Sequence, residues 1–509
     1  MTAVPRATFR VRHLHIDTLS EHVIFIHEQA VTDGNLGFRP LDRVRVVEAD
    51  PAAGVVPREV IGVLNFCRDA LVEPDEIGLS DDAARDLDLA PGARVLATIS
   101  PAPRSVDLVR DKLHGQRLDE AGFRAILTDV TRRRYSKVEL SMFVLACALR
   151  RLNLAELVAY TRAMIDTGTR LDLGRGPIAD KHSVGGVPGN RTTMVVVPIL
   201  AALGLTVPKT SSRAITSPAG TADTMATLAE VALPPERLRA VIGAAGACIA
   251  WGGALDLAPA DDILITVERP MELDTEAQMV ASILAKKKTA GATHVLIDIP
   301  VGHSAKVRSS AAAQRLSRLF RAVAHAIELE VDVIATDAPG PIGWGIGPRL
   351  EALDVLAVLQ RRAAAPLDLR EKSLYLAARL LEMTGATPPA GGYRRALEVL
   401  DSGQALTAFE RIVAAQGARE MPPPAPFQRV VEAPADGRIR AIDCWQIARV
   451  AKCAGAPANA AAGVRLLHTV GDVVARGSGL FEIHAQSAAQ LEFALAYAAA
   501  RPQLFALGF

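Results

Sequence analysis

The chain has 509 residues, of which 50% are hydrophobic and 22% charged, so it can form several globular domains with sizeable cores. Its formal net charge of +1 and its aromatic content of 4% exclude a strong global field, or a stacking surface, that would recruit nucleic acid or an acidic membrane. The five cysteines lack metal-ligand spacing, which predicts small core residues. The first residues lack the apolar segment that a signal peptide contains, so we expect a cytoplasmic protein.

Residues 1–102 have the pattern of a small β-barrel-like domain. Alternating or apolar runs predict strands at 9–12, 23–26, 43–46, 60–66 and 94–97. Ser80 is placed to cap a short acidic helix. A set of four histidines could suggest a metal site, but its spacing is wrong for one, and we expect surface histidines on strands. They are His13, His15, His22 and His27.

From about residue 103 to 168, the hydrophobic residues recur with the period of a helix. Apolar residues recur on one helical face at 123, 126, 127 and 130, and again between 140 and 147, which predicts three to four helices. A second helical piece follows Trp251, with a turn at 258–261 and a helix that begins near Asp274.

Two polar loops flank one apolar segment between residues 180 and 224. The first loop is rich in glycine at 185–190, and the second is rich in hydroxyl groups at 210–221. Glycines let the backbone approach an anion, and a helix N-terminus behind such a loop offers free N–H donors. Lys181, Arg213 and the hydroxyls can bind phosphate oxygens. A lone glycine-rich loop is more often an ordinary turn, but the pair predicts an anion site.

The uncharged stretch at 192–208, between the two loops, approaches the length of a membrane span. Pro198 and Gly204 interrupt it, and polar loops lie at both ends, so we predict a buried core helix.

These loops resemble the thymidine phosphorylase superfamily. The similar positions are Lys181-His182-Ser183, Gly185-Gly186-Val187, Ser211 and Gly220-Thr221. The strings KHSVGGVPGN at 181–190 and SRAITS at 212–217 look most like the AMP phosphorylase branch, which also has an additional N-terminal domain.

The resemblance implies roles for individual residues. The phosphate site implied by it consists of Lys181, Ser183, Thr192, Ser211 and Thr221. The implied substrate-binding set is Gly186, Ser212, Arg213, Ala214, Ile215, Thr216, Ser217, Ser282, Lys286 and Lys306. Either His182 or Asp274 is the implied acid for the leaving base, although Asp274 could equally serve as a helix N-cap.

The resemblance also implies an α+β multidomain fold. Its parts are a β-barrel-like domain at 1–102, an all-α domain at 103–168 plus 258–290, a large α/β domain with a mixed sheet at 169–257 plus 291–420, and a C-terminal β-rich module at 427–509. The two central domains are expected to close over the site and to exclude water.

The rest of the α/β domain shows two more strands, at 294–299 and 331–336. The first leads into a polar loop and a helix with apolar residues from 316 to 327, and Lys306 is expected near the start of that helix. The loop at 338–348 is either a flexible lid or a long connection. Chain breaks are predicted at 387–392 and 421–426.

The C-terminal module resembles a biotinyl- or lipoyl-type hammerhead in its segments 431–439 and 470–477. A carrier protein would need a modified lysine in a tight turn between the two halves. Lys452 alone lies between them, and its context is wrong for such a turn, so we interpret the module as structural.

The sequence therefore predicts a phosphorolytic pentosyltransferase of the AMP phosphorylase type, with thymidine phosphorylase as the alternative. Phosphate is the expected co-substrate, with no metal or organic cofactor, and the expected partners are a small nucleoside or nucleotide and further copies of the chain. In thymidine phosphorylases an arginine contacts the pyrimidine, and it would align near Val267, which argues against strict thymidine specificity; the nearby Arg269 is the alternative position for it. Two rival classes are an anthranilate phosphoribosyltransferase-like enzyme and a non-catalytic nucleotide-binding protein.

Overall fold

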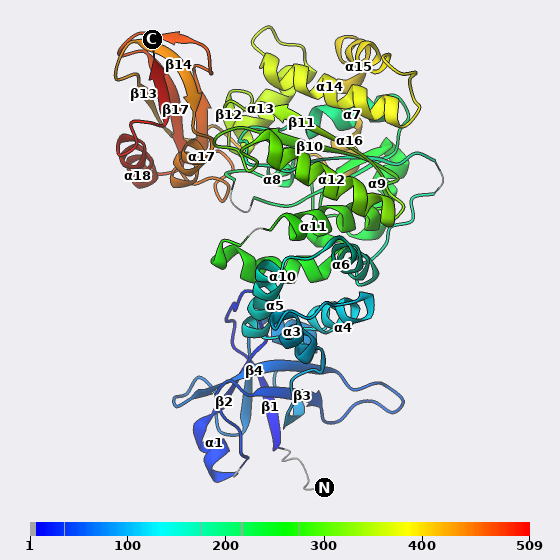
Figure 1. Ribbon diagram of the computed structural model, residues 1–509. Coiled ribbons are helices and arrows are strands. Elements are labelled where there is room, and N and C mark those ends of the chain that lie inside the picture. Colours follow the sequence, from blue (N-terminus) through cyan, green and yellow to red (C-terminus); the bar gives the residue numbers. More distant parts are fainter. Residues whose placement is uncertain (1–6, 35, 175, 215–216, 274, 509) are drawn as a thin grey trace. The chain divides into compact units, whose positions relative to one another are not determined.

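The computed structural model describes residues 7–34, 36–174, 176–214, 217–273 and 275–508. The chain forms two compact units, Met1–Gly168 with Ala258–Ala281 and Thr169–Leu257 with Ser282–Phe509. Figure 1 shows their helices and strands. The chain thus leaves the first unit once and returns to it, as a two-piece helical domain requires.

The first unit begins with a closed barrel in the strand order β1-β5-β2-β4-β3-β6. The strands are β1 (Ala7–His13), β2 (Val23–His27), β3 (Arg43–Glu48), β4 (Glu59–Cys67), β5 (Glu76–Leu79) and β6 (Arg94–Ile99). Val44 and Val46 point into the barrel and are fully buried, while Arg45 between them is exposed. This alternation is the period of two that a half-buried strand requires. Two short helices, α1 (Glu28–Asp33) and α2 (Asp81–Leu87), accompany the barrel.

Two predictions for this domain need correction. Ser80 is the N-cap residue of α2, but its hydroxyl makes no cap bond; it accepts from the Val23 amide and donates to the Glu21 carbonyl. His22 is buried, with Nδ1 3.1 Å from the Ile61 carbonyl oxygen and Nε2 2.9 Å from an Asp86 carboxylate oxygen, so it is not a surface histidine. Within the described residues, no group of three or more His, Cys, Asp or Glu side chains could hold a metal ion.

A helical bundle completes the first unit. Its helices are α3 (Ser105–Leu113), α4 (Glu120–Thr131), α5 (Lys137–Leu149), α6 (Leu154–Asp166) and α10 (Pro259–Met271). The predicted apolar faces are confirmed, since Phe123 and Phe143 are fully buried and pack against Tyr160 with ring centroids 5.3 Å and 6.0 Å away. The turn predicted at 258–261 is wrong, because Pro259 starts α10, where its missing N–H has no helical partner to lose.

Parallel strands form the sheet of the α/β domain, which is the first part of the second unit. β7 (Ala179–Ser183), β10 (His294–Val301) and β11 (Glu330–Asp337) pair in the order β11-β10-β7, and β8 (Val207–Ser211) pairs with β9 (Ala247–Trp251). A parallel bridge between Ile178 and Thr206 connects the two groups. The expected mixed sheet is therefore corrected, because the described strands of this sheet pair in parallel. Antiparallel pairing of the described residues of this domain occurs in an isolated bridge between Ala229 and Ala418 and in β12 (Gly345–Ile346), which pairs with a strand of the C-terminal module.

Helices surround this sheet. They are α7 (Thr193–Ala202), α8 (Thr221–Ala226), α9 (Pro235–Ala245), α12 (Ser310–Ala326), α13 (Pro348–Leu359), α14 (Leu367–Met383), α15 (Gly392–Asp401) and α16 (Gln404–Gln416). α7 is buried along its length and shares one core with Leu374 and Phe409. The predicted core helix is confirmed but ends at Ala202, after which the chain enters β8. Among the helices of the described residues, none is long and apolar enough to cross a membrane.

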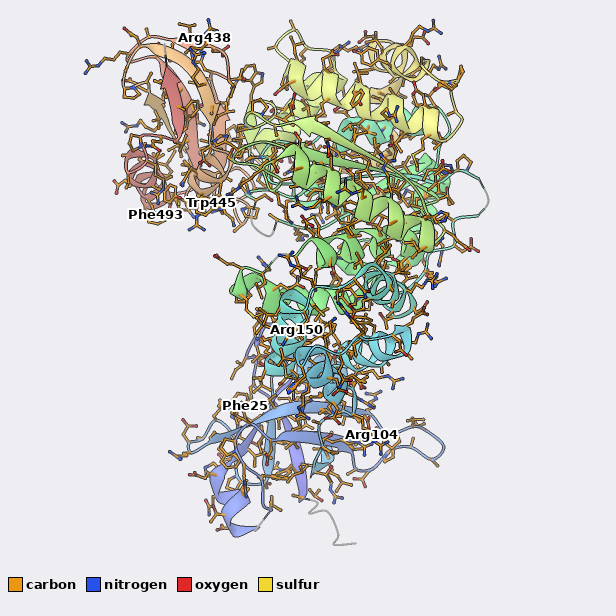
Figure 2. The ribbon with its side chains drawn as sticks, in the orientation of Figure 1. Phe25, Arg104, Arg150, Arg438, Trp445 and Phe493 are labelled. Carbon is orange, nitrogen blue, oxygen red and sulfur yellow. The ribbon has the colours of Figure 1, made fainter. Side chains whose placement is uncertain are left out.

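The C-terminal module contains two antiparallel sheets. Its strands are β13 (Phe427–Glu432), β14 (Gly437–Ile442), β15 (Gly463–Leu466), β16 (Val473–Val474), β17 (Gly479–Ala485) and β18 (Phe505–Gly508), and its helices are α17 (Cys444–Cys453) and α18 (Ala488–Ala499). Figure 2 shows the exposed Trp445 on α17 and the exposed Phe493 on α18. Lys452 lies in α17 rather than in a turn between strands, so it does not fit a carrier lysine.

The loop after β11 contains a short strand, so it is more than a plain connection. Its strand β12 (Gly345–Ile346) pairs with β15 and so joins a sheet of the C-terminal module. One carboxylate oxygen of Asp354 accepts from the amides of Trp344 and Gly345, each over 2.7 Å. The Ile342 amide donates to the Pro188 carbonyl over 3.0 Å. We call residues 338–347 the strap, because they connect the glycine-rich loop to the C-terminal module.

Candidate active site

The glycine-rich loop connects β7 to α7. Gly186 has a φ of +84°, and a Cβ there would lie 2.4 Å from the Lys306 amide nitrogen. Gly189 has a φ of +73°, and a Cβ there would lie 2.0 Å from the Ile342 carbonyl oxygen. Side chains at these positions would therefore separate the loop from both of the segments that pack against it.

Three of the predicted phosphate-binding residues lie on one chain of hydrogen bonds. Lys181 Nζ donates to Thr192 Oγ1 over 2.8 Å, and Thr192 donates to Asn190 Oδ1 over 3.0 Å. The Asn190 amide donates to Ser183 Oγ over 3.1 Å, and Ser183 in turn donates to Asp298 over 3.1 Å. The structure thus brings Lys181, Ser183 and Thr192 together around the start of α7, where an anion is favoured.

Asp298 belongs to this group, although the sequence analysis did not single it out. It is fully buried within β10, 3.1 Å from Lys372 Nζ, and it accepts from Thr336 Oγ1 over 2.6 Å. Burial favours the neutral acid, but the Lys372 and Lys181 cations and the Thr336 hydroxyl outweigh it, so the pKa of Asp298 is lowered. A charged residue inside an otherwise apolar strand was the signal that could have identified it.

Lys181 is 2% exposed. Burial lowers the pKa of its ammonium group to about 7, although the neighbouring Asp298 carboxylate acts in the opposite direction. The side chain is therefore close to the balance between its charged and neutral forms at neutral pH. An incoming phosphate would shift that balance toward the ammonium form.

His182 is half-buried at the next position of β7. Burial, followed by the nearby cations of Lys287, Lys209, Lys181 and Lys306, holds its pKa well below the usual range. Its ring is therefore neutral at pH 7 and can offer an N–H without carrying charge. Asp274, the other candidate acid, lies outside the described residues.

The second loop is held by Asp223 on α8. Its carboxylate accepts from the Ala214 amide over 2.6 Å, from the Gly220 amide over 2.9 Å and from Arg213 Nη1 over 3.3 Å. The Arg213 guanidinium also lies over the Trp251 ring, 5.1 Å from its centroid. Arg213 therefore braces this loop, whatever else it binds.

The other predicted residues of the second loop have local positions. Ser211 ends β8 and donates to the Ser212 carbonyl over 3.3 Å, and Ser217 donates to the Ala219 carbonyl over 2.9 Å. Ile215 and Thr216 lie outside the described residues.

Arg191 connects the two loops, and the sequence analysis missed it. Its guanidinium donates to Thr221 Oγ1 over 2.9 Å and to the Ala219 carbonyl over 2.8 Å, and it pairs with the fully buried Glu351 on α13. The predicted phosphate-binding hydroxyl of Thr221 is thus tied to the residue next to Thr192.

The remaining predicted residues lie on two further segments. Ser282 and Lys286 are half-buried on α11 (Glu276–Thr289), one turn apart. Lys306 is exposed in the loop after β10, and its backbone packs against Gly186. The expectation that Lys306 lies near a helix start is corrected, since α12 begins only at Ser310. Val267, where the pyrimidine-contacting arginine would align, is buried in α10.

Two family models match the chain. A family model described as "Glycosyl transferase family, a/b domain" matches residues 175–406, and one described as "Glycosyl transferase family, helical bundle domain" matches residues 106–168. Proteins named "Putative thymidine phosphorylase" are 49% identical over 495 residues in Polaromonas sp. (strain JS666), 48% over 503 residues in Ralstonia nicotianae, and 44% over 491 residues in Methylococcus capsulatus. These alignments cover 97%, 99% and 96% of this chain and 95%, 97% and 94% of the relatives.

The chain belongs to the thymidine phosphorylase superfamily. It is accordingly a glycosyltransferase-type enzyme of the nucleoside phosphorylase class, and the non-catalytic alternative is set aside.

Solved structures with a similar fold include an anthranilate phosphoribosyltransferase. The anthranilate phosphoribosyltransferase of Thermus thermophilus matches with a TM-score of 0.52 and 21% identity, over 61% of this chain and 99% of that one. This chain therefore shares the fold of that enzyme over about three fifths of its length.

Proposed function

We propose that the enzyme cleaves the N-glycosidic bond of a nucleoside 5′-monophosphate with inorganic phosphate. The products are the free base and ribose 1,5-bisphosphate. The observation that carries the proposal is the hydrogen-bonded group of Lys181, Thr192, Asn190 and Ser183 beside a glycine-rich loop. It combines a buried cation with hydroxyl donors, as a phosphate site requires.

In this reaction, a phosphate oxygen forms a bond to the anomeric carbon while the bond from that carbon to the base nitrogen breaks. The electron pair leaves with the base, and the sugar passes through an oxocarbenium-like state. Lys181 and the hydroxyls would hold phosphate in line, so that attack becomes effectively unimolecular. Phosphate acts as a co-substrate, and we propose no metal or organic cofactor.

The leaving base needs a proton or a hydrogen bond as its bond to the sugar breaks. The neutral ring of His182 suits hydrogen-bond donation, since its low pKa argues against a stable imidazolium ion. We propose that Asp274 supplies the proton where the base requires one. Ser282 and Lys286 would contact the base.

The 5′-phosphate is the finer part of the proposal. Lys181 and several hydroxyls are sufficient to bind a single attacking phosphate. Arg213, Ser217 and Lys306 are therefore donors in excess of what that phosphate needs. An arginine and hydroxyls on one loop suit a second anion. The buried Val267 supports weak selection for thymidine, because it cannot donate to a pyrimidine.

Thymidine phosphorolysis is the second candidate. The names of the relatives favour it, and so does the pairing of Arg213 with Asp223, which gives the arginine a structural task. Catalytic efficiency with phosphate for AMP, CMP and UMP, against adenosine, cytidine, uridine and thymidine, separates the two. A clear preference for thymidine would overturn the 5′-monophosphate proposal. A homo-oligomeric assembly and a cytoplasmic location stay predictions.

A further inference from the structure

Three charged side chains meet behind the phosphate site. Asp180 on β7, Lys209 on β8 and Lys287 on α11 are 0%, 3% and 2% exposed. Lys287 Nζ lies 2.7 Å from Asp180 Oδ2, and Lys209 Nζ lies 3.5 Å from Asp180 Oδ1. We call these residues the Asp180 cluster. It connects two strands and the helix that carries Ser282 and Lys286.

One carboxylate needs a single cation for neutrality, yet this one has two lysines beside it. A second buried amine costs desolvation energy, and an apolar residue of the same size would avoid that cost. Stability of the fold therefore does not explain Lys209. Burial lowers the pKa of Lys209 well below its usual range, while Asp180 opposes this effect. We therefore looked to the candidate active site for the role of Lys209.

The contacts of the cluster lead directly to that site. Lys209 Nζ donates to the Lys181 carbonyl over 2.8 Å, and the Lys181 amide donates to Asp180 Oδ1 over 2.6 Å. Both backbone groups of the phosphate-binding lysine are thus held by the cluster. Lys287 also donates to the Thr210 carbonyl over 3.3 Å, next to Ser211.

We propose that Lys209 and Lys287 are positioning residues, which hold Lys181 on β7, Ser211 on β8 and the base-binding face of α11 in register for phosphorolysis. This inference rests on the proposed function for the identity of the site. The two lysines act through the backbone and through Asp180, and they do not touch the substrate. A small displacement of Lys181 would be costly, because a misplacement of about 1 Å can lower the rate about 100-fold.

The cluster also acts on His182. The cations that lower the pKa of its ring are Lys287 from α11, Lys209 from β8, Lys181 from β7 and Lys306 from the loop after β10. Asp180 lies between the two cluster lysines. Removing one cation should make protonation of the ring easier, so the pKa of His182 should rise. That titration reports whether the charge of Lys209 acts on the site, and the phosphate affinity, compared with that of Lys112→Met, reports whether Lys209 positions it.

The test replaces Lys209 with methionine, which keeps the length of the side chain and leaves the Asp180–Lys287 pair intact. The matched control is Lys112→Met in the helical bundle. Lys112 is also fully buried, beside Glu156, which keeps Arg117 as a second cation. We expect Lys209→Met to raise the Michaelis constant for phosphate and to lower kcat, each by about tenfold or more, at a thermal stability similar to that of the control.

Histidine NMR gives a second readout that does not depend on turnover. The His182 ring signal, assigned by its loss in His182→Asn, should titrate at a higher pH in Lys209→Met than in the wild type or in Lys112→Met. Lys209→Arg, which keeps a cationic donor, should restore most of the phosphate affinity measured by calorimetry. Unchanged phosphate affinity and an unchanged His182 titration in a folded Lys209→Met protein would overturn the inference.

If the wild-type protein binds phosphate but releases no base, the proposed function fails. The binding and titration experiments would still decide whether Lys209 positions the site. If Lys209→Met does not fold, Lys287→Met decides instead, since it removes the contact with the Thr210 carbonyl and leaves the Asp180–Lys209 pair. A loss of phosphate affinity in that folded variant supports the inference, and wild-type affinity contradicts it.

Discussion

The Lys181 ammonium group donates to the Thr192 hydroxyl over 2.8 Å, with both side chains almost completely buried. The two residues come from opposite ends of the glycine-rich loop, and Thr192 stands directly before α7. Their contact therefore fixes the width of the loop and directs the cation toward the helix N-terminus. It also gives the proposed phosphate site a preformed geometry, in which little reorganisation is required on binding.

Replacement of Lys181 by alanine should disable phosphorolysis. A charge-assisted contact would be lost where negative charge is held during the reaction, so we expect kcat/KM for phosphate to fall by about 100-fold or more. Steady-state kinetics with varied phosphate measures this. Lys288→Ala serves as the control, since Lys288 donates to the Glu328 carbonyl at the protein surface. A wild-type kcat/KM for phosphate in Lys181→Ala would show that Lys181 does not bind phosphate.

Phosphate binding should take up a proton at alkaline pH. The pKa of Lys181 is about 7, so above that pH the free enzyme holds a neutral amine, and a bound anion favours the charged form. Calorimetry at pH 8 in buffers of different ionisation enthalpy measures the uptake. We expect a buffer-dependent enthalpy in the wild type and a smaller one in Lys181→Met. Equal buffer dependence in both proteins would assign the proton to another group.

Gly186 should tolerate alanine far less than its neighbour Gly185. Both have positive φ angles, +84° and +95°, so both substitutions carry backbone strain of about 1 kcal/mol or more. Only the Cβ at Gly186 would also collide with Lys306, because nothing lies within 4 Å of a Cβ at Gly185. Phosphate affinity should therefore fall much further in Gly186→Ala. Similar losses in the two variants would show that the contact with Lys306 is unimportant.

The strap should show a pH-dependent stability that comes from Asp354. Burial raises the pKa of this carboxyl from 3.8 to about 7, although the amides of Gly345 and Trp344 oppose the effect. The folded state therefore binds the proton more tightly than the unfolded state, and stability is lost as the pH rises from about 4 through 7.

Asp354→Asn should remove this loss, because an amide oxygen can accept the same two bonds without ionising. The thermal midpoint of the variant, relative to the wild type, should increase between pH 4 and pH 7. The corresponding free energy is at most about 4 kcal/mol. A constant difference across this range would contradict the assignment.

The sequence was sufficient for the local features and for the family. Strands with clear alternation, such as 43–46, and helices with clear faces, such as 120–131, were predicted because the hydrophobic period is visible within a few residues. β5 was missed, since its four residues are too short to show a period. The mixed sheet was wrong, although the continuous apolar run of β10 is typical of a strand in a parallel sheet, which is buried on both faces.

The site was predicted as separate motifs, and the connections between them were not. Arg191 and Glu351 are 160 positions apart in the sequence, and Lys209 and Lys181 are 28 positions apart. No local sequence pattern therefore predicts either contact. The strap was also missed, because a two-residue strand has no pattern of its own. The role of a buried charge such as Asp298 can be assigned only when the fold shows which partners contact it.

Arg213 should matter more for a 5′-monophosphate than for a nucleoside. We expect Arg213→Ala to remove most of the preference for the monophosphate, while cleavage of the nucleoside changes little. Asp223→Asn is the comparison, because it weakens the same loop but keeps the arginine. If both variants lose both activities in parallel, Arg213 only braces the loop and the second anion site is wrong.

The central claim is that phosphate, and not water, displaces the base. Phosphorus NMR of the purified enzyme with a nucleoside or a nucleoside 5′-monophosphate, in the presence and in the absence of inorganic phosphate, tests it directly. We predict a new resonance for a phosphate ester at the anomeric carbon and equimolar release of free base, with neither product in the absence of phosphate and both greatly reduced in Lys181→Ala. Base release at the same rate without phosphate, or free pentose as the sugar product, would contradict it.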